Sequence, residues 1–194
     1  MNPESPITRS LLSRLTEGFA LPTRSVHGPA HWMRVRANGL RLAHETGANC
    51  CVVELFAVLH DSCRLNDFHD PEHGPRAAEL AYDLYLEGRI PCALAELNLL
   101  TQACEGHTHG DLNIDPTIAT CWDADRLDLY RVGITPDPKR LCTEAARQLT
   151  HRQFAEIKAD DWLWRTHSRA SAPLRLSAQQ QNYPQRLGIP REVR

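Results

Sequence analysis

Histidine and aspartate side chains interrupt the apolar stripes of several predicted helices in this 194-residue chain. His31 and His60 fall on inward faces, Asp61 follows His60 directly, and Asp125 takes the centre of a third stripe. Removing a carboxylate from water is costly unless a cation or several donors compensate. A set of imidazoles and carboxylates without thiolate suits Mn, Fe, Co, Ni, Zn or Mg. We therefore expect a divalent metal ion among these helices, with His31, His60, Asp61 and Asp125 as candidate ligands.

Each of these residues also has a purely structural explanation. A single inward histidine is more often a hydrogen-bonded core residue than a metal ligand, and Arg126 or Arg131 could neutralise Asp125 through an ion pair. Several such residues together favour a metal site over separate structural roles, and His107 adds to their number because it continues a further apolar stripe. Three imidazoles and two carboxylates in one apolar interior do not easily neutralise one another, whereas a cation satisfies all of them. We therefore prefer the metal site.

The elements that must position these residues are predicted to be helices. Apolar residues recur at intervals of three and four between Ser10 and Phe154, and runs of strict alternation are missing. This pattern predicts an all-α fold. Pro29 suits the first turn of a helix that ends before Gly47, and the polar residues at 64–71 predict a loop. The predicted helices cover residues 29–45, 48–61, 73–87, 91–104, 116–131 and 138–157.

The composition is that of a globular protein. Of the residues, 42% are hydrophobic and 24% are charged, and no apolar run is long enough to span a bilayer. The N-terminus lacks the features of a secretion signal, so we expect a cytoplasmic location. A net charge of −2 argues against an extended nucleic-acid surface. The seven cysteines, an odd number, are expected to be reduced and structural.

The order of the predicted ligands resembles that of a known family. His31, then the pair His60-Asp61, and then Asp125 follow the H…HD…D order of the HD superfamily of metal-dependent phosphohydrolases. The neighbouring residues are similar as well, namely His-Trp-Met-Arg-Val in the first motif, Val-Leu-His-Asp in the second and Asp-Ala-Asp-Arg-Leu-Asp in the last. The resemblance covers residues 26–133. It implies a helical bundle with the metal at its centre.

Binuclear members of that superfamily carry extra histidines between the HD pair and the last aspartate. In this chain His73, His107 and His109 lie in that interval, and the first two resemble such ligands more closely. The resemblance thus implies one metal ion and allows a second, bridged by Asp61. The Gly-Tyr-Pro signature of the cyclic-dinucleotide phosphodiesterases is missing, so the substrate of that branch is not carried over.

The resemblance also implies a reaction, the hydrolysis of a nucleotide or another small phosphate ester by a metal-activated water. Asp61 and Arg64 are the predicted catalytic residues, with Arg64 the nearest candidate to bind phosphate oxygens. Arg76 is expected to be a solvated surface residue, and Asp123 and Asp128 to be exposed or to support the ligands from behind. Three alternatives stay open, a di-iron oxygenase on the same scaffold, a non-catalytic binding module stabilised by a structural metal, and a nuclease, which the balanced charge disfavours.

The C-terminal part of the chain differs in composition from the rest. We expect residues 1–167 to form the HD-type domain, with Trp162 and Trp164 packed against the bundle. From Ser168 onward the sequence is rich in Ser, Ala, Pro, Gln and Arg and has little to bury. Residues 168–194 are therefore expected to form an extended or disordered tail.

Overall fold

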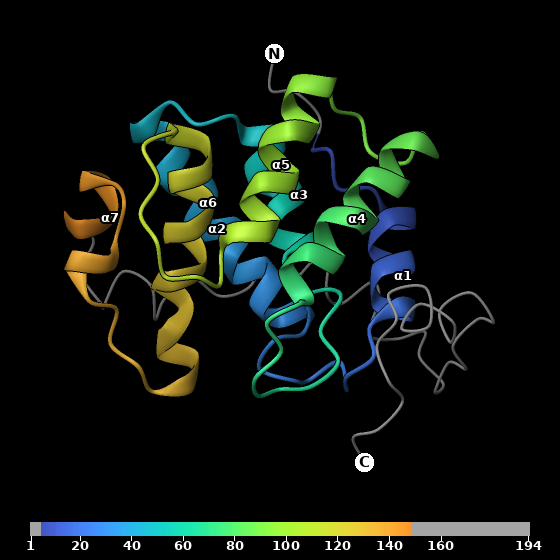
Figure 1. Cartoon of the computed structure of the whole chain (residues 1–194), viewed down its shortest axis with the longest axis horizontal. Coiled ribbons are helices and arrows are strands. Elements are labelled where there is room, and N and C mark those ends of the chain that lie inside the picture. The colour runs from blue at the N-terminus through green and yellow to red at the C-terminus, as the bar shows by residue number, and fades with distance from the viewer. Residues whose placement is uncertain (1–4, 149–194) are drawn as a thin grey trace.

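The computed structural model describes residues 5–148, and all of their regular structure is helical. The elements (Figure 1) are α1 Arg9–Gly18, α2 Pro29–Thr46, α3 Cys50–Leu59, α4 His73–Leu86, α5 Leu94–Gly106, α6 Pro116–Arg126, the 3-10 helices η1 Leu127–Val132 and η2 Pro138–Arg140, and α7 Glu144–Gln148. No strand occurs among these residues, so the prediction of an all-α fold is confirmed for this part of the chain. The predicted tail at 168–194, the boundary at residue 167, and Trp162 and Trp164 lie outside the described residues.

Helix α3 forms the centre of the bundle because its sequence is apolar on nearly every side. Every side chain at positions 52–59 is buried, including Glu54, whose carboxylate is bound by Arg36 and Ser5. Helices α2, α4, α5 and α6 pack against α3, and Figure 1 shows α5 in front of it. A helix that is hydrophobic all round is stable only when neighbours surround it. His60, which follows α3 directly, is thereby placed inside the bundle.

Two glycines allow neighbouring helices to approach closely. A Cβ on Gly74, in the first turn of α4, would lie 2.4 Å from the carbonyl oxygen of Cys104 in α5. A Cβ on Gly106, at the end of α5, would lie 2.5 Å from the indole of Trp122 in α6. Any side chain at these positions would push the helices apart. The glycines therefore bring the start of α4, the end of α5 and the middle of α6 into contact.

The prediction of one helix at 138–157 is wrong within the described residues. The short 3-10 helix η2 is followed by Leu141, which is extended, and then by α7. The carboxylate of Asp123 accepts the backbone N–H groups of Cys142 and Thr143, each at 2.7 Å. Because these two N–H groups are bound by a side chain of α6, they cannot join a continuous helix.

The other predicted helices are confirmed with shifts at their ends. The helix predicted at 91–104 starts at Leu94, because the side chain of Glu96 accepts the N–H of Ala93 and ends the preceding loop there. The helix predicted at 116–131 is an α-helix only to its eleventh residue and continues as the 3-10 helix η1. The loop predicted at 64–71 is confirmed.

None of the helices within residues 5–148 has the length and apolar character needed to cross a membrane. The seven cysteines all lie in the described part of the chain and are free thiols, as predicted. Cys104 and Cys121 are buried in the core, whereas Cys50 is exposed and has no such packing role.

Candidate metal centre

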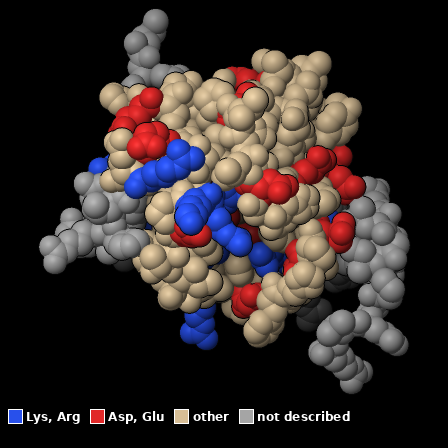
Figure 2. Space-filling view, turned by 60° about the vertical axis from the view of Figure 1, so that its left-hand side comes forward, with Lys and Arg blue, Asp and Glu red and all other residues tan. Residues whose placement is uncertain are grey.

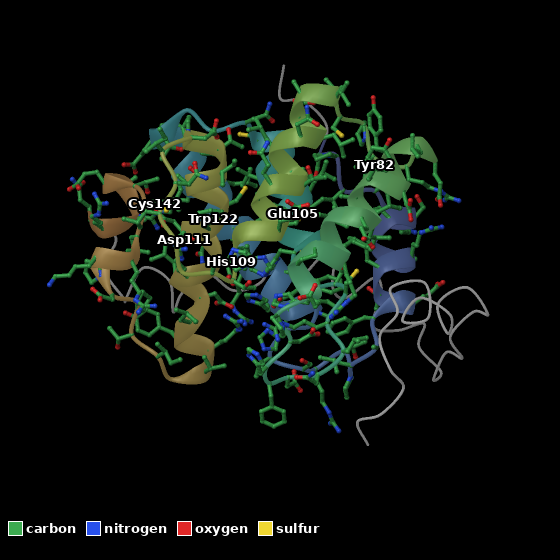
Figure 3. The ribbon with its side chains drawn as sticks, in the orientation of Figure 1. Tyr82, Glu105, His109, Asp111, Trp122 and Cys142 are labelled. Carbon is green, nitrogen blue, oxygen red and sulfur yellow. The ribbon has the colours of Figure 1, made fainter. Side chains whose placement is uncertain are left out.

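The six predicted metal ligands lie at neighbouring helix ends. They are His31, His60, Asp61, His73, His107 and Asp125, and their donor atoms form three overlapping groups, each within 4.8 Å. Helices α2 and α4 contribute from their first turns, and α3, α5 and α6 from their last turns or the residues that follow. Figure 3 shows many nitrogen-bearing side chains gathered in this part of the bundle, below the labelled His109. The exposed His109 belongs to none of the three groups.

The Nδ1 atom of each of these histidines is bonded to an oxygen acceptor. The acceptors are backbone carbonyls for His60, His73 and His107, and the carboxylate of Asp128 for His31. A neutral ring that donates through Nδ1 carries a lone pair on Nε2. Metal-binding histidines in proteins are commonly oriented by such a bond on the other nitrogen. All four Nε2 atoms are therefore presented as metal-competent donors.

These Nε2 atoms form two close pairs. The Nε2 atoms of His31 and His60 are 3.0 Å apart, and those of His73 and His107 are 2.9 Å apart. With the ring protons on Nδ1, two lone pairs face each other in each pair and neither neutral ring donates. Such a contact is stabilised by a cation or an added proton between the two nitrogens. Each pair is therefore suited to hold a metal ion.

Asp61 lies between the two pairs. Its Oδ2 atom is 3.4 Å from Nε2 of His31 and 3.7 Å from Nε2 of His60. Its Oδ1 atom is 3.1 Å from Nε2 of His73 and 3.8 Å from Nε2 of His107. Each carboxylate oxygen thus faces a different histidine pair, which is the arrangement of a carboxylate that can be shared by two cations.

Asp125 completes the group around the first pair. Its Oδ1 atom is 3.3 Å from Nε2 of His31 and 3.7 Å from Nε2 of His60. Its side chain is 18% exposed, so it marks the side of the centre that solvent reaches. The alternative ionic partners bind elsewhere: Arg126 donates to two backbone carbonyls and Arg131 lies against another aspartate. Among the described ion pairs, the partners of Asp125 are therefore the two histidines, while Arg131 acts on it only through its charge.

The buried carboxylates and imidazoles shift one another's pKa values. Burial disfavours the charged forms of Asp61 and Asp125, but the imidazoles around them outweigh it and hold both pKa values well below their usual range. Burial lowers the pKa of His60 to about 3 despite the nearby carboxylates. At His31, burial is outweighed by hydrogen bonds to Asp125, Asp128 and Asp61, which raise the pKa to about 9. Both carboxylates are thus ionised at neutral pH and available to a cation.

The two arginines considered in the sequence have different surroundings. Arg64 donates through Nε to Oδ1 of Asp61 at 2.8 Å, and its side chain is 12% exposed at the edge of the centre. The expectation that Arg76 is a solvated surface residue is wrong. Arg76 is buried, where it binds the carboxylate of Asp70 and the carbonyl oxygen of Cys63. It therefore anchors the loop before α4 to the start of that helix.

The two aspartates that flank Asp125 also differ. Asp128 supports a ligand from behind, as predicted, because it accepts a hydrogen bond from Nδ1 of His31 at 2.7 Å. Arg34 in turn binds Asp128 through two nitrogens, at 2.7 and 2.9 Å. Asp123 is fully buried and bound to the backbone before α7, so the expectation that it is exposed or supports a ligand is wrong.

One residue that touches the centre was not predicted from the sequence. His27, in the segment before α2, donates through Nδ1 to Oδ2 of Asp61 at 2.7 Å. In the sequence, His27 could have been noticed from its spacing of four residues from His31, because two residues with this spacing share one face of a helix. Gly28 and Pro29 follow His27, however, and start the helix only after it.

Figure 2 shows how charged side chains are distributed on one face of the molecule. Lys and Arg side chains form a compact patch near the middle of this face, with Asp and Glu side chains beside them. Much of the rest of the face is uncharged. On this face, the basic groups thus stand close to acidic ones rather than forming an extended basic surface.

In comparisons with known proteins, the chain matches no family model, no curated protein and no solved structure.

Proposed function

We propose that this chain is a metal-dependent phosphohydrolase of the HD type that acts on a nucleotide or another small phosphate ester. The observation that carries the proposal is the position of Asp61, whose two carboxylate oxygens face different histidine pairs. The order of His31, His60-Asp61 and Asp125 along the chain supports the HD assignment. Oxygen and imidazole donors of this kind suit the divalent ions used in phosphate ester hydrolysis.

The proposal assigns a role to each ligand. One ion would be held by His31, His60, Asp125 and Oδ2 of Asp61, and a second by His73, His107 and Oδ1 of Asp61. A divalent ion bound there supplies a water of lowered pKa and polarises a phosphoryl oxygen. The histidines keep their Nε2 lone pairs directed at the ions because carbonyls and a carboxylate hold their Nδ1 protons.

Arg64 would bind the phosphate. A phosphoryl group in transfer carries charge on its equatorial oxygens, which planar guanidinium groups bind well. Arg64 lies beside the shared carboxylate and is partly exposed. Its Nε donates to Asp61 and its Nη1 to the carbonyl oxygen of Phe68, so Nη2 is the nitrogen that would face a substrate. Asp125, the partly exposed ligand, marks the side from which substrate would reach the ions.

A second candidate is a di-iron oxygenase, because a carboxylate between two histidine pairs also suits two iron ions. Iron content together with oxygen consumption would distinguish it from a hydrolase. A third candidate, the binding module with a structural metal, predicts a closed coordination shell with no position for water. The partial exposure of Asp125 favours an open site over a closed one.

The test begins with metal analysis of the purified chain. An activity screen then covers phosphomonoesters, phosphodiesters and nucleotides, with Mn, Co, Ni or Mg added. We expect metal-dependent turnover that falls by more than about 100-fold in Asp61→Ala, since outer residues alone typically cost 10 to 100-fold. Asp83→Ala, at an exposed position of α4, is the matched control and should keep the activity. A metal-loaded protein that hydrolyses none of these substrates would contradict the proposal.

A further inference from the structure

His27 lies outside the six predicted ligands and still contacts their centre. It belongs to the segment between α1 and α2, and its Nδ1 atom donates to Oδ2 of Asp61 at 2.7 Å. Its own backbone is held on both sides. The N–H donates to Oγ of Ser25 at 3.0 Å, and the carbonyl accepts the indole N–H of the fully buried Trp32 at 2.8 Å. These backbone hydrogen bonds therefore fix the position from which the imidazole contacts Asp61.

We propose that His27 is a positioning residue for the metal centre, one that holds the Asp61 carboxylate so that each oxygen faces a different histidine pair. The inference deepens the proposed function and rests on the metal site assumed there. A carboxylate can rotate about its Cβ–Cγ bond unless both oxygens are held. Here Oδ1 accepts from Nε of Arg64 at 2.8 Å, and Oδ2 accepts from His27.

The hydrogen bond from His27 is compatible with a metal on the same oxygen. A carboxylate has about four lone-pair sites on its two oxygens, so Oδ2 can accept one N–H and still bind a cation. Arg64 is the group that the proposed function assigns to the substrate phosphate, and a substrate would compete for it. His27 is then the donor that keeps Asp61 in place while substrate is bound.

A chain of contacts supports the other side of the centre. Nη1 of Arg131 donates to the carbonyl of Asp128 at 3.2 Å, and Nη2 of Arg131 lies 3.4 Å from Nδ1 of His27, to which it makes no hydrogen bond when Nδ1 donates to Asp61. Asp128 accepts from Nδ1 of His31, whose Nε2 atom is 3.4 Å from Oδ2 of Asp61. His27 and Asp128 therefore each restrain one predicted ligand from outside the set.

The test compares two substitutions of His27 in the full chain. His27→Leu keeps a comparable volume and removes the donor, whereas His27→Asn places an amide N–H near the position of Nδ1. His44→Leu, at an exposed position of α2, is the control. Each protein is stripped of metal with a chelator and titrated with Co²⁺ by calorimetry and visible absorption. Melting of the metal-free proteins by circular dichroism reports folding separately.

We expect the Co²⁺ affinity of His27→Leu to fall by about 10 to 100-fold, with an altered visible spectrum, as is typical for loss of an outer support. His27→Asn and His44→Leu should stay close to the unsubstituted protein. Unchanged Co²⁺ affinity in His27→Leu would overturn the inference, whether or not its melting temperature falls. Equal loss in His27→Asn would also overturn it, because the ring would then act as a ligand. Failure of the unsubstituted chain to bind Co²⁺ would instead refute the metal centre of the proposed function.

Discussion

Asp123 and Asp125 are two residues apart in α6, and their carboxylates serve different parts of the protein. Asp125 faces the Nε2 atoms of His31 and His60. Asp123 points away from them and accepts two backbone N–H groups just before α7, together with the hydroxyl of Thr143. One helix thus connects the candidate metal centre to the last described helix through neighbouring acidic residues.

Substitution of Asp123 should therefore affect stability and leave metal binding unchanged. Asp123→Ala leaves two backbone N–H groups without their acceptor, which we expect to cost about 1–3 kcal/mol of unfolding free energy. Urea denaturation of the metal-free protein measures this loss, and Co²⁺ titration measures the affinity. Asp125→Ala is the comparison, and it should weaken Co²⁺ binding. Similar loss of affinity in both variants would contradict the division of roles.

Metal removal should lower the melting temperature. A ligand that binds only the folded state stabilises it, by about 2.7 kcal/mol when its concentration is 100 times its dissociation constant. We expect chelator to remove this increment and added Mn²⁺ or Co²⁺ to restore it. His107→Ala leaves Asp61 and His73 without the third group of their set. This variant should lose part of the metal-dependent stabilisation and about half of the bound metal. His44→Ala should retain both, and equal metal content in the two variants would count against His107 as a ligand.

The stability of the metal-free protein should fall between pH 6.5 and pH 9. Carboxylates around His31 outweigh its burial and raise its pKa from 6.5 to about 9. A group whose pKa is raised by folding contributes stability that is complete below its unfolded pKa and is lost as pH rises through its folded pKa. His60, with a pKa lowered by burial to about 3, is largely neutral in both states above pH 6.5 and contributes little there.

This pH dependence is measured as the free energy of unfolding in urea, with chelator present, at several pH values across that window. Asp128→Asn removes one of the charges that raise the pKa of His31, so its stability should vary less with pH. An unfolding free energy that is constant or increases from pH 6.5 to 9 would show that His31 is not protonated in the folded protein.

Substitution of Gly74 should disturb the second histidine pair. The added Cβ of Gly74→Ala would meet the carbonyl of Cys104, and relief of such an overlap typically costs about 1–3 kcal/mol. Because His73 precedes Gly74 and His107 follows α5, separation of α4 from α5 should also weaken metal binding at this pair. Asp83→Ala, on the exposed side of α4, should stay within about 0.5 kcal/mol. A Gly74→Ala protein with unchanged stability would argue against the close approach.

The helices that carry the six ligands were predictable because their patterns are local. Each inward stripe repeats within one helix, so a polar residue such as Asp125 or His60 stands out against its neighbours at three and four residues. The break before α7 was not predictable in this way. It depends on a hydrogen bond from Cys142 to Asp123, which lies in another helix.

Two residues near the centre were misjudged for the same reason. Arg76 is a charged residue in the first turn of α4. Only the fold shows that it is buried and donates hydrogen bonds to the carboxylate of Asp70 and the carbonyl oxygen of Cys63. His27 precedes Gly28 and belongs to no helical stripe, so its approach to Asp61 follows from the path of the segment before α2. The periodicity of apolar residues therefore predicts ligands that lie on helices, but it does not predict contacts that depend on the path of a loop.

The wide spacing of the ligands along the chain has a consequence for biosynthesis. The set begins at His31 and ends at Asp125, so a nascent chain must be translated past α6 before all six donors exist. A truncated product that ends before Pro116 would lack Asp125 and the helix that carries it. Binding of a cation by all six donors would then require that the five helices from α2 to α6 have already assembled.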